Sequence, residues 1–180
     1  MSVAFLDPGQ GAQIPGMLHQ LPDRAEATST LQEASQVLGR DVLTLDTEQA
    51  LSSTGAVQLA LFVSGVAATR IMQAEGVKPD VVAGLSVGAF AAAVAAGALA
   101  FKDGLSLVKL RAELMEKAHP QGYRLAAVIG LSETHLSQIR ARHPFFHRIA
   151  AGPHTDRPSV HCISRRSSDR FESDADRLGR

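Results

Sequence analysis

The sequence predicts an α/β fold with a parallel sheet, and three observations support this. Short apolar runs typical of buried strands alternate with longer segments that carry apolar residues at helical spacing. One such run is followed immediately by a Gly-x-Ser-x-Gly turn and an alanine-rich segment, which is the order strand, turn, helix. The chain has 180 residues, 45% of them hydrophobic, which suffices for one domain with a core, with or without an appendage.

The first part of the chain contains one predicted strand and two predicted helices. Residues 3–6 are an apolar run that ends at a strong Asp-Pro-Gly turn signal, so we expect a buried strand there. Residues 23–38 have helical character, and residues 57–75 carry apolar side chains at helical spacing. We therefore expect two helices after the first strand.

The same alternation continues along the chain. Residues 81–83 are predicted to form a strand, and residues 89–101 a buried helix. This apolar stretch is too short to cross a bilayer, which needs ~20 apolar residues. Residues 101–117 are predicted to form an amphipathic helix, 125–129 a strand and 132–142 a further helix. No membrane anchor is expected.

These elements suggest three parts: residues 1–124, 125–143 and 144–180. The last part holds half of the chain's arginines, none of its lysines and few apolar residues in any period. Its plainest interpretation is a disordered tail. The alternatives are a segment from a shifted reading frame or truncated gene, a nucleic-acid-binding tail and a histidine metal site.

Composition limits the classes of partner. Basic and acidic residues balance at 18 each, so no overall field attracts polyphosphate and a nucleic-acid partner is not expected. The single cysteine, Cys162, excludes an internal disulfide and a CxxC metal knuckle. We expect no metal and no bound cofactor. Residues 1–6 lack the pattern of a signal peptide, so the cytoplasm is the expected location.

The segment Gly84-Leu85-Ser86-Val87-Gly88 carries the clearest chemical signal. Between a strand and a helix, this motif is a nucleophile elbow, in which a sharp turn exposes the serine Oγ at the helix N-terminus. There the helix dipole favours developing negative charge. The alternative is a serine that only caps the helix. We expect Ser86 to be a nucleophile.

A second glycine-rich segment, Pro-Gly-Gln-Gly-Ala-Gln at residues 8–13, follows the first predicted strand. It is too short for a phosphate-binding P-loop and lacks the lysine, so ATP binding is not indicated. Loops at the carboxyl ends of neighbouring parallel strands meet at one edge of the sheet. This loop is therefore a candidate to offer backbone N–H groups beside Ser86, unless it is a plain tight turn.

Together these segments resemble the malonyl-CoA:acyl-carrier-protein transacylase family. The likeness rests on PGQGAQ, on Gln58 within a predicted helix, on GLSVG and on LVKLRAELM, and it covers roughly residues 3–143. Within that family the chain is most similar to the malonate decarboxylase epsilon subunit, because Leu85 stands where fatty-acid transacylases usually carry histidine. The resemblance implies a patatin-like large subdomain, with 125–143 as the start of an incomplete ferredoxin-like small subdomain.

The resemblance also implies residue roles. Ser86 would accept the acyl group, and Gln10 with the Val87 backbone N–H would form the oxyanion hole. Arg111 would bind the free malonyl carboxylate, because a guanidinium fork selects a dicarboxylic acyl group over acetyl. Gln58 would line the same pocket. If the Gly-x-Ser-x-Gly motif were absent, the preferred interpretation of Arg111 would be an ordinary surface arginine on an amphipathic helix.

A general base is missing from this assignment. Serine is a weak nucleophile that needs a base within hydrogen-bond reach, and the family's histidine lies in sequence far downstream of the elbow. No residue of this chain matches that context. The histidines at positions 119, 135, 143, 147, 154 and 161 are therefore interpreted as surface or tail residues.

The function implied is transfer of a malonyl group from malonyl-CoA, through an acyl-serine, to the phosphopantetheine-type thiol of an acyl carrier protein. In the malonate decarboxylase system that thiol belongs to the complex's own carrier subunit, and other subunits become possible partners. Two alternatives remain open. One is a serine hydrolase of patatin or α/β-hydrolase type, and the other is a catalytically impaired remnant or docking subunit.

Overall fold

The computed structural model describes residues 2–118, 124–128, 135, 138, 147–148 and 161–165. The chain divides into two compact units, Met1–Lys117 and Ala118–Arg180. The finer predicted boundaries, after residues 124 and 143, stay predictions.

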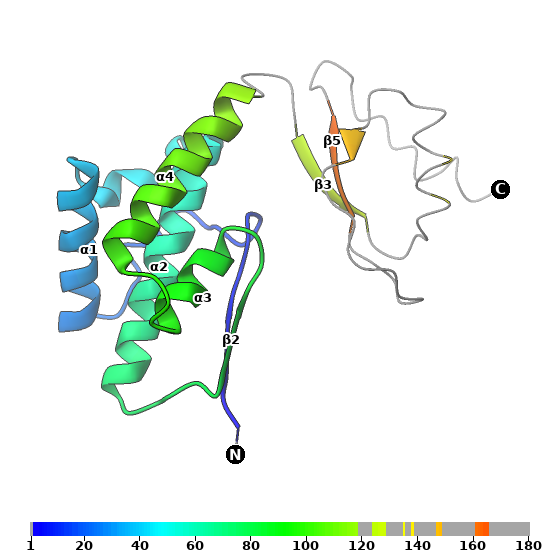
Figure 1. Ribbon diagram of the computed structural model, residues 1–180. Coiled ribbons are helices and arrows are strands. Elements are labelled where there is room, and N and C mark those ends of the chain that lie inside the picture. Colours follow the sequence, from blue (N-terminus) through cyan, green and yellow to red (C-terminus); the bar gives the residue numbers. More distant parts are fainter. Residues whose placement is uncertain are drawn as a thin grey trace. The chain divides into compact units, whose positions relative to one another are not determined.

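The first unit is built on a short parallel sheet. Strand β1, Ala4–Asp7, pairs with β2, Val81–Gly84, in a register that joins Ala4 to Val81 and Asp7 to Gly84. Between them lie α1, Ala25–Leu38, two 3-10 turns, Val42–Asp46 and Ala50–Ser52, and the long helix α2, Thr54–Ala74. After β2 come α3, Gly88–Ala95, and α4, Phe101–Ala118. The α/β class and the parallel pairing are thus confirmed (Figure 1).

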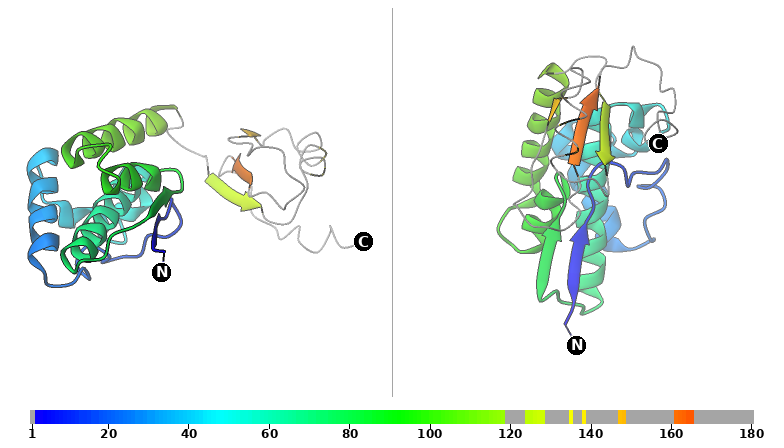
Figure 2. Two further views of the ribbon diagram at one scale, coloured as in Figure 1. Left: turned by 60° about the horizontal axis from the view of Figure 1, so that its bottom comes forward. Right: turned by 90° about the vertical axis from the view of Figure 1, so that its right-hand side faces the viewer.

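Helix α2 forms the centre of the first unit. Eleven of its residues are buried, and it packs against α1 on one side and α3 on the other. Although α2 is long and apolar enough to cross a membrane by length and composition, 61% of its most apolar window is buried inside the fold. Its apolar side chains therefore build a protein core. The right view of Figure 2 shows the ribbon of this helix behind strands β1 and β2.

The ends of these helices are set by local chemistry. Ser53 caps α2, its hydroxyl accepting from the backbone N–H groups of Gly55 and Ala56. Gly39, with φ of 68°, closes α1 in the left-handed conformation that glycine favours. The prediction of one helix over 89–101 is wrong, because α3 ends at Ala95 and Gly97 follows with φ of 71°.

The first strand also differs from its prediction. Phe5 is buried against the helices, but Leu6 is 75% exposed. The expectation of a buried strand therefore holds for one face only.

The second unit contains an antiparallel sheet in the order β3-β5-β4. Its strands are β3, Arg124–Val128, β4, His147–Arg148, and β5, His161–Arg165. Two of these strands fall within 144–180, and the rest of that segment lies outside the described residues, as does Ile129 of the predicted strand. Of the predicted helix over 132–142, the described residues His135 and Gln138 are helical and exposed.

Candidate active site

Ser86 lies in the turn between β2 and α3 with its backbone in the left-handed region. Its φ of 56° makes it the only non-glycine residue with positive φ in the part of the chain that the structure describes. That conformation costs an L-residue about 1–2 kcal/mol, and strain of this kind clusters at functional sites. Ser86 is exposed, as the predicted elbow requires.

The two flanking glycines permit this turn for a steric reason. A Cβ on Gly84 would lie 2.2 Å from the Gly88 carbonyl carbon and oxygen. A Cβ on Gly88 would lie 2.3 Å from the Asp7 carbonyl oxygen. Real side chains do not approach backbone so closely, so the elbow exists only because both positions lack a Cβ.

The glycine-rich loop after β1 lies directly against the elbow. A Cβ on Gly9 would be 2.9 Å from the Leu85 carbonyl oxygen, and the Leu85 N–H donates to the Asp7 carbonyl at 3.0 Å. The structure thereby brings together the two segments that carry the candidate oxyanion donors, Gln10 and Val87. Within the turn itself, the Gly88 N–H donates to the Leu85 carbonyl oxygen at 2.9 Å.

Arg111 contacts Ser86 directly. Its Nη2 donates to the Ser86 Oγ at 2.9 Å, and its Nη1 donates to the Oε1 of Gln58. Gln58 is fully buried on α2, and its Nε2 donates to the Sδ of Met115 at 3.4 Å. The structure thus joins three residues that were singled out from the sequence, Ser86, Arg111 and Gln58.

Met115 was not singled out in the sequence. It follows Arg111 by four residues on α4, which places both on one face of the helix. This spacing along α4 is visible in the sequence. The contact of Met115 with Gln58 depends on how α2 and α4 pack, which no local pattern of residues shows.

The contact between α2 and α4 is fixed near both ends. Near one end, the Phe62 and Phe101 rings stack with centroids 5.5 Å apart. At the other, the Glu116 carboxylate accepts from the Ser53 hydroxyl and the Gly55 N–H, each at 2.8 Å. Gln58 and Arg111 lie between these two points along their helices, so their pairing follows from the packing.

Two groups in this region have shifted pKa values. Burial lowers the pKa of the Arg111 guanidinium, which nevertheless stays charged at neutral pH because arginine starts so high. Burial also raises the pKa of the Asp7 carboxyl, at the end of β1. The Asp7 Oδ2 has no hydrogen-bond partner, and a Cβ on Gly65 would lie 2.6 Å from its Oδ1.

The described residues do not identify a general base. The Ser86 hydroxyl is hydrogen-bonded to Arg111, which cannot accept a proton. Side chains of His119, His143 and His154 lie outside the described residues, as do those of His147 and His161 within their strands. The described residues contain no group of His, Cys, Asp and Glu arranged to hold a metal ion.

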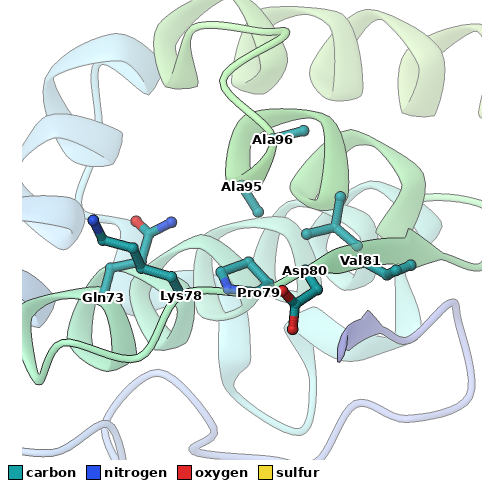
Figure 3. A pocket seen from close by; sticks show the side chains of 8 residues that line it. Gln73, Lys78, Pro79, Asp80, Val81, Ala95 and Ala96 are labelled. Atoms are coloured by element: carbon teal, nitrogen blue, oxygen red, sulfur yellow. The ribbon is translucent and has the colours of Figure 1, made fainter. Parts of the chain in front are cut away.

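A cavity of about 420 Å³ lies elsewhere, at the other end of β2. It is lined by the start of that strand, by the end of α3 and by α2 and the turn after it: Gln73, Lys78, Pro79, Asp80, Val81, Val82, Ala95 and Ala96 (Figure 3). Ser86, by contrast, follows the end of β2 and precedes the start of α3. This cavity is therefore separate from Ser86.

Comparison with known proteins agrees with this arrangement. The acyl transferase domain family matches residues 4–159. The chain belongs to this family. The match extends beyond residue 143, where the resemblance found in the sequence ended.

Individual members of the family show the same likeness. The malonyl CoA-acyl carrier protein transacylase of Bacillus subtilis is 38% identical over 143 residues, which cover 76% of this chain and 45% of the relative. The acyl-carrier-protein S-malonyltransferase of Burkholderia pseudomallei superposes with a TM-score of 0.76 at 35% identity, covering 92% of this chain and 55% of that one. This chain therefore spans about half the length of the relatives it matches.

A third similar structure is a malonyl-transacylase in complex with its type II polyketide synthase acyl-carrier protein. It has a TM-score of 0.76 and 30% identity, and the match covers 92% of this chain and 55% of that one. The solved structures thus support an acyltransferase fold for this chain.

Proposed function

We propose that this chain carries the acyl-accepting site of a malonyl-CoA:acyl-carrier-protein transacylase. The observation that supports this best is the hydrogen bond from Arg111 to the Ser86 hydroxyl at 2.9 Å. A cation beside a nucleophile favours an acyl group that carries a negative charge close to its reacting carbonyl. Malonyl has one methylene between its thioester carbonyl and its carboxylate, so it can reach both residues.

The first half-reaction begins with attack of the Ser86 Oγ on the thioester carbonyl carbon of malonyl-CoA. The carbonyl oxygen gains negative charge, and in this proposal the Val87 N–H and the Gln10 loop stabilise it. The carbon–sulfur bond then breaks, and coenzyme A leaves as its thiol with the proton that the serine gave up. The product is a malonyl ester on Ser86.

The second half-reaction repeats these steps with a different nucleophile. The phosphopantetheine-type thiol of an acyl carrier protein attacks the ester carbonyl, and the bond to Ser86 Oγ breaks as the serine regains a proton. Arg111 holds the malonyl carboxylate through both halves. Each proton transfer needs a base, which the described residues do not supply.

Leu85 favours a narrower version of this proposal. It stands in the elbow where fatty-acid transacylases usually have histidine. In this respect the chain resembles the malonate decarboxylase epsilon subunit. In that version, the acceptor is the carrier subunit of a malonate decarboxylase. Faster transfer to such a carrier than to a fatty-acid carrier protein would support it, and the reverse preference would exclude it.

The test is to incubate the chain with malonyl-CoA, measure its intact mass and map the modified peptide. A malonyl group on Ser86 that moves to added carrier protein is the expected result. Ser86→Ala should abolish the label, whereas Ser106→Ala, at a serine of α4 that bonds the Lys102 carbonyl, should leave it unchanged. A label elsewhere that survives Ser86→Ala would overturn the proposal. Release to water at equal rates with and without carrier protein would instead identify a hydrolase.

A further inference from the structure

The segment that carries Gln10 is attached to the rest of the fold at its two ends. In the part of the chain that the structure describes, every hydrogen bond of residues 10–15 is made to another residue of the segment 9–20, such as that from the Gly11 N–H to the Gln13 Oε1 at 2.7 Å. A Cβ added to Gly11 would meet no atom within 4 Å. We call residues 8–15 the glycine loop, and its position depends on what holds its ends.

The first end of the glycine loop lies against the elbow, and the second is held by Asp46. This residue is fully buried at the end of the 3-10 turn Val42–Asp46. Its backbone carbonyl accepts from the Gly16 N–H at 2.9 Å, and its Oδ2 accepts from the Leu18 N–H at 2.7 Å. The Nδ1 of His19 lies 3.1 Å from the same Oδ2. One buried side chain therefore gathers the residues that follow the glycine loop.

The second end depends on Asp46 because it is buried. Leu18 is 1% exposed and belongs to the core, so water cannot replace Asp46 as the acceptor for its N–H. A buried N–H without a partner is costly, so removal of the carboxyl group would favour release of residues 16–19 from the turn. The glycine loop would then be held at the elbow end alone.

The turn that carries Asp46 is itself part of the core. Val42 and Leu45 are buried in the same cluster as residues of α2, and the turn packs against α1 and α2. Helix α2 also carries Gln58, whose Oε1 accepts from Arg111. The glycine loop and Arg111 are thus both positioned with reference to one helix.

We propose that Asp46 is a positioning residue, which fixes the loop that carries Gln10 relative to Ser86. The step to catalysis rests on the proposed function, because Gln10 acts as an oxyanion donor only there. Such donors act within roughly 2.7–3.1 Å of the developing charge, so a loosened loop should slow attack by Ser86. Arg111 would still hold the malonyl carboxylate, so substrate binding should change little.

The first test needs no substrate. In the full 180-residue chain, ¹⁵N relaxation gives order parameters for the Gly11 and Ala12 amides. We expect rigid values in the wild type and values below about 0.6, typical of flexible backbone, in Asp46→Ala. Asp46→Asn should restore rigidity, because its amide oxygen can still accept from the Leu18 N–H.

The second test measures labelling of Ser86 over a range of malonyl-CoA concentrations. In Asp46→Ala, the rate constant at saturation should fall at least about tenfold, since loss of one oxyanion donor costs roughly a hundredfold or more. The half-saturating concentration should change less than about twofold. Asp46→Asn should recover most of the rate.

The matched control is Thr30→Ala, which also removes a buried, hydrogen-bonded polar group. Thr30 donates to the Glu26 carbonyl at 2.7 Å and accepts from Arg70 at 2.9 Å, and neither partner belongs to the glycine loop. This variant should lose stability but keep the order parameters and the labelling rate. If circular dichroism shows that Asp46→Ala does not fold, His19→Ala, at a ring 55% exposed, should change both readouts in the same direction by less.

Three results would overturn the proposal. The first is a glycine loop as rigid in the folded variant as in the wild type, and the second is a mobile loop with an unchanged labelling rate. The third is equal slowing in Thr30→Ala, which would reduce the effect to lost stability. Absence of Ser86 labelling in the wild type would contradict the proposed function alone, and relaxation would still test whether Asp46 holds the loop.

Discussion

The elbow at Ser86 and the pair formed by Gln58 and Arg111 are adjacent but are built differently. The elbow is fixed by backbone: Gly84 and Gly88 allow strand and helix to approach within distances that no side chain tolerates. The Gln58–Arg111 pair is fixed by side chains on α2 and α4, more than fifty residues apart in sequence. The proposed nucleophile therefore depends on glycines within one short segment, and the arginine proposed to bind the acyl group depends on tertiary packing.

This difference predicts how each region responds to mutation. Changes in the elbow glycines should act on folding, because the clash is with backbone that cannot move aside. Changes in the Gln58–Arg111 pair should act on substrate preference while the fold survives.

The largest effect is expected for Gly88→Ala. Its Cβ would meet the Asp7 carbonyl oxygen at 2.3 Å, so unfolding free energy measured in urea should fall by about 3 kcal/mol or more. Gly97→Ala is the matched control, since φ is 71° there but no atom lies within 4 Å of the added Cβ. It should cost about 1–2 kcal/mol. Equal losses in the two variants would contradict a steric origin for the elbow.

An intermediate effect is expected for Gln58→Leu. Leucine has similar size but cannot accept from Arg111, so the guanidinium loses its buried partner. A hydrogen bond to a charged group is worth roughly 1.5 kcal/mol, so labelling of Ser86 at limiting malonyl-CoA should slow about tenfold. Gln73→Leu, an exposed glutamine on the same helix, should have no effect. An unchanged rate in Gln58→Leu would mean that packing alone positions Arg111.

The smallest effect is expected for Asp7→Asn and should depend on pH. Burial raises the pKa of the Asp7 carboxyl in the folded chain, so ionisation of this group destabilises the fold. The variant should therefore gain stability over the wild type as pH rises from the usual aspartate pKa through the raised value. The gain should vanish in acid, where the wild-type carboxyl is neutral in both states. Urea unfolding across this range measures it, and a gain independent of pH would refute the explanation.

The same contrast explains how far the sequence alone could predict the site. The elbow was predictable because its strand, glycines and helix are contiguous, and the glycine loop because the ends of parallel strands meet. Arg111 and Gln58 could be assigned only through family resemblance, since no local pattern shows that α4 lies against α2. The contact of Met115 with Gln58 was missed for the same reason.

The sequence predicted the fold well where the periodicity was long and less well where elements were short. Helix α2 was predicted nearly in full because its apolar spacing extends over many turns. The prediction for 89–101 ran too far, because alanine continues beyond the glycine that ends α3. The exposure of Leu6 could not be predicted, since an apolar run of four residues does not reveal how many sheet faces are covered.

The most direct test of the central claim, that Ser86 and Arg111 together select a malonyl group, is a competition for acylation. Equal amounts of malonyl-CoA and acetyl-CoA would be offered, and both products on the Ser86 peptide would be counted by mass spectrometry. We predict a strong malonyl preference in the wild type that falls at least about tenfold in Arg111→Ala, from loss of a charge-assisted hydrogen-bonded pair. Lys109→Ala, which removes an exposed cation from the same helix, should retain the preference. An unchanged malonyl preference in Arg111→Ala would contradict the account, because another group would then bind the carboxylate.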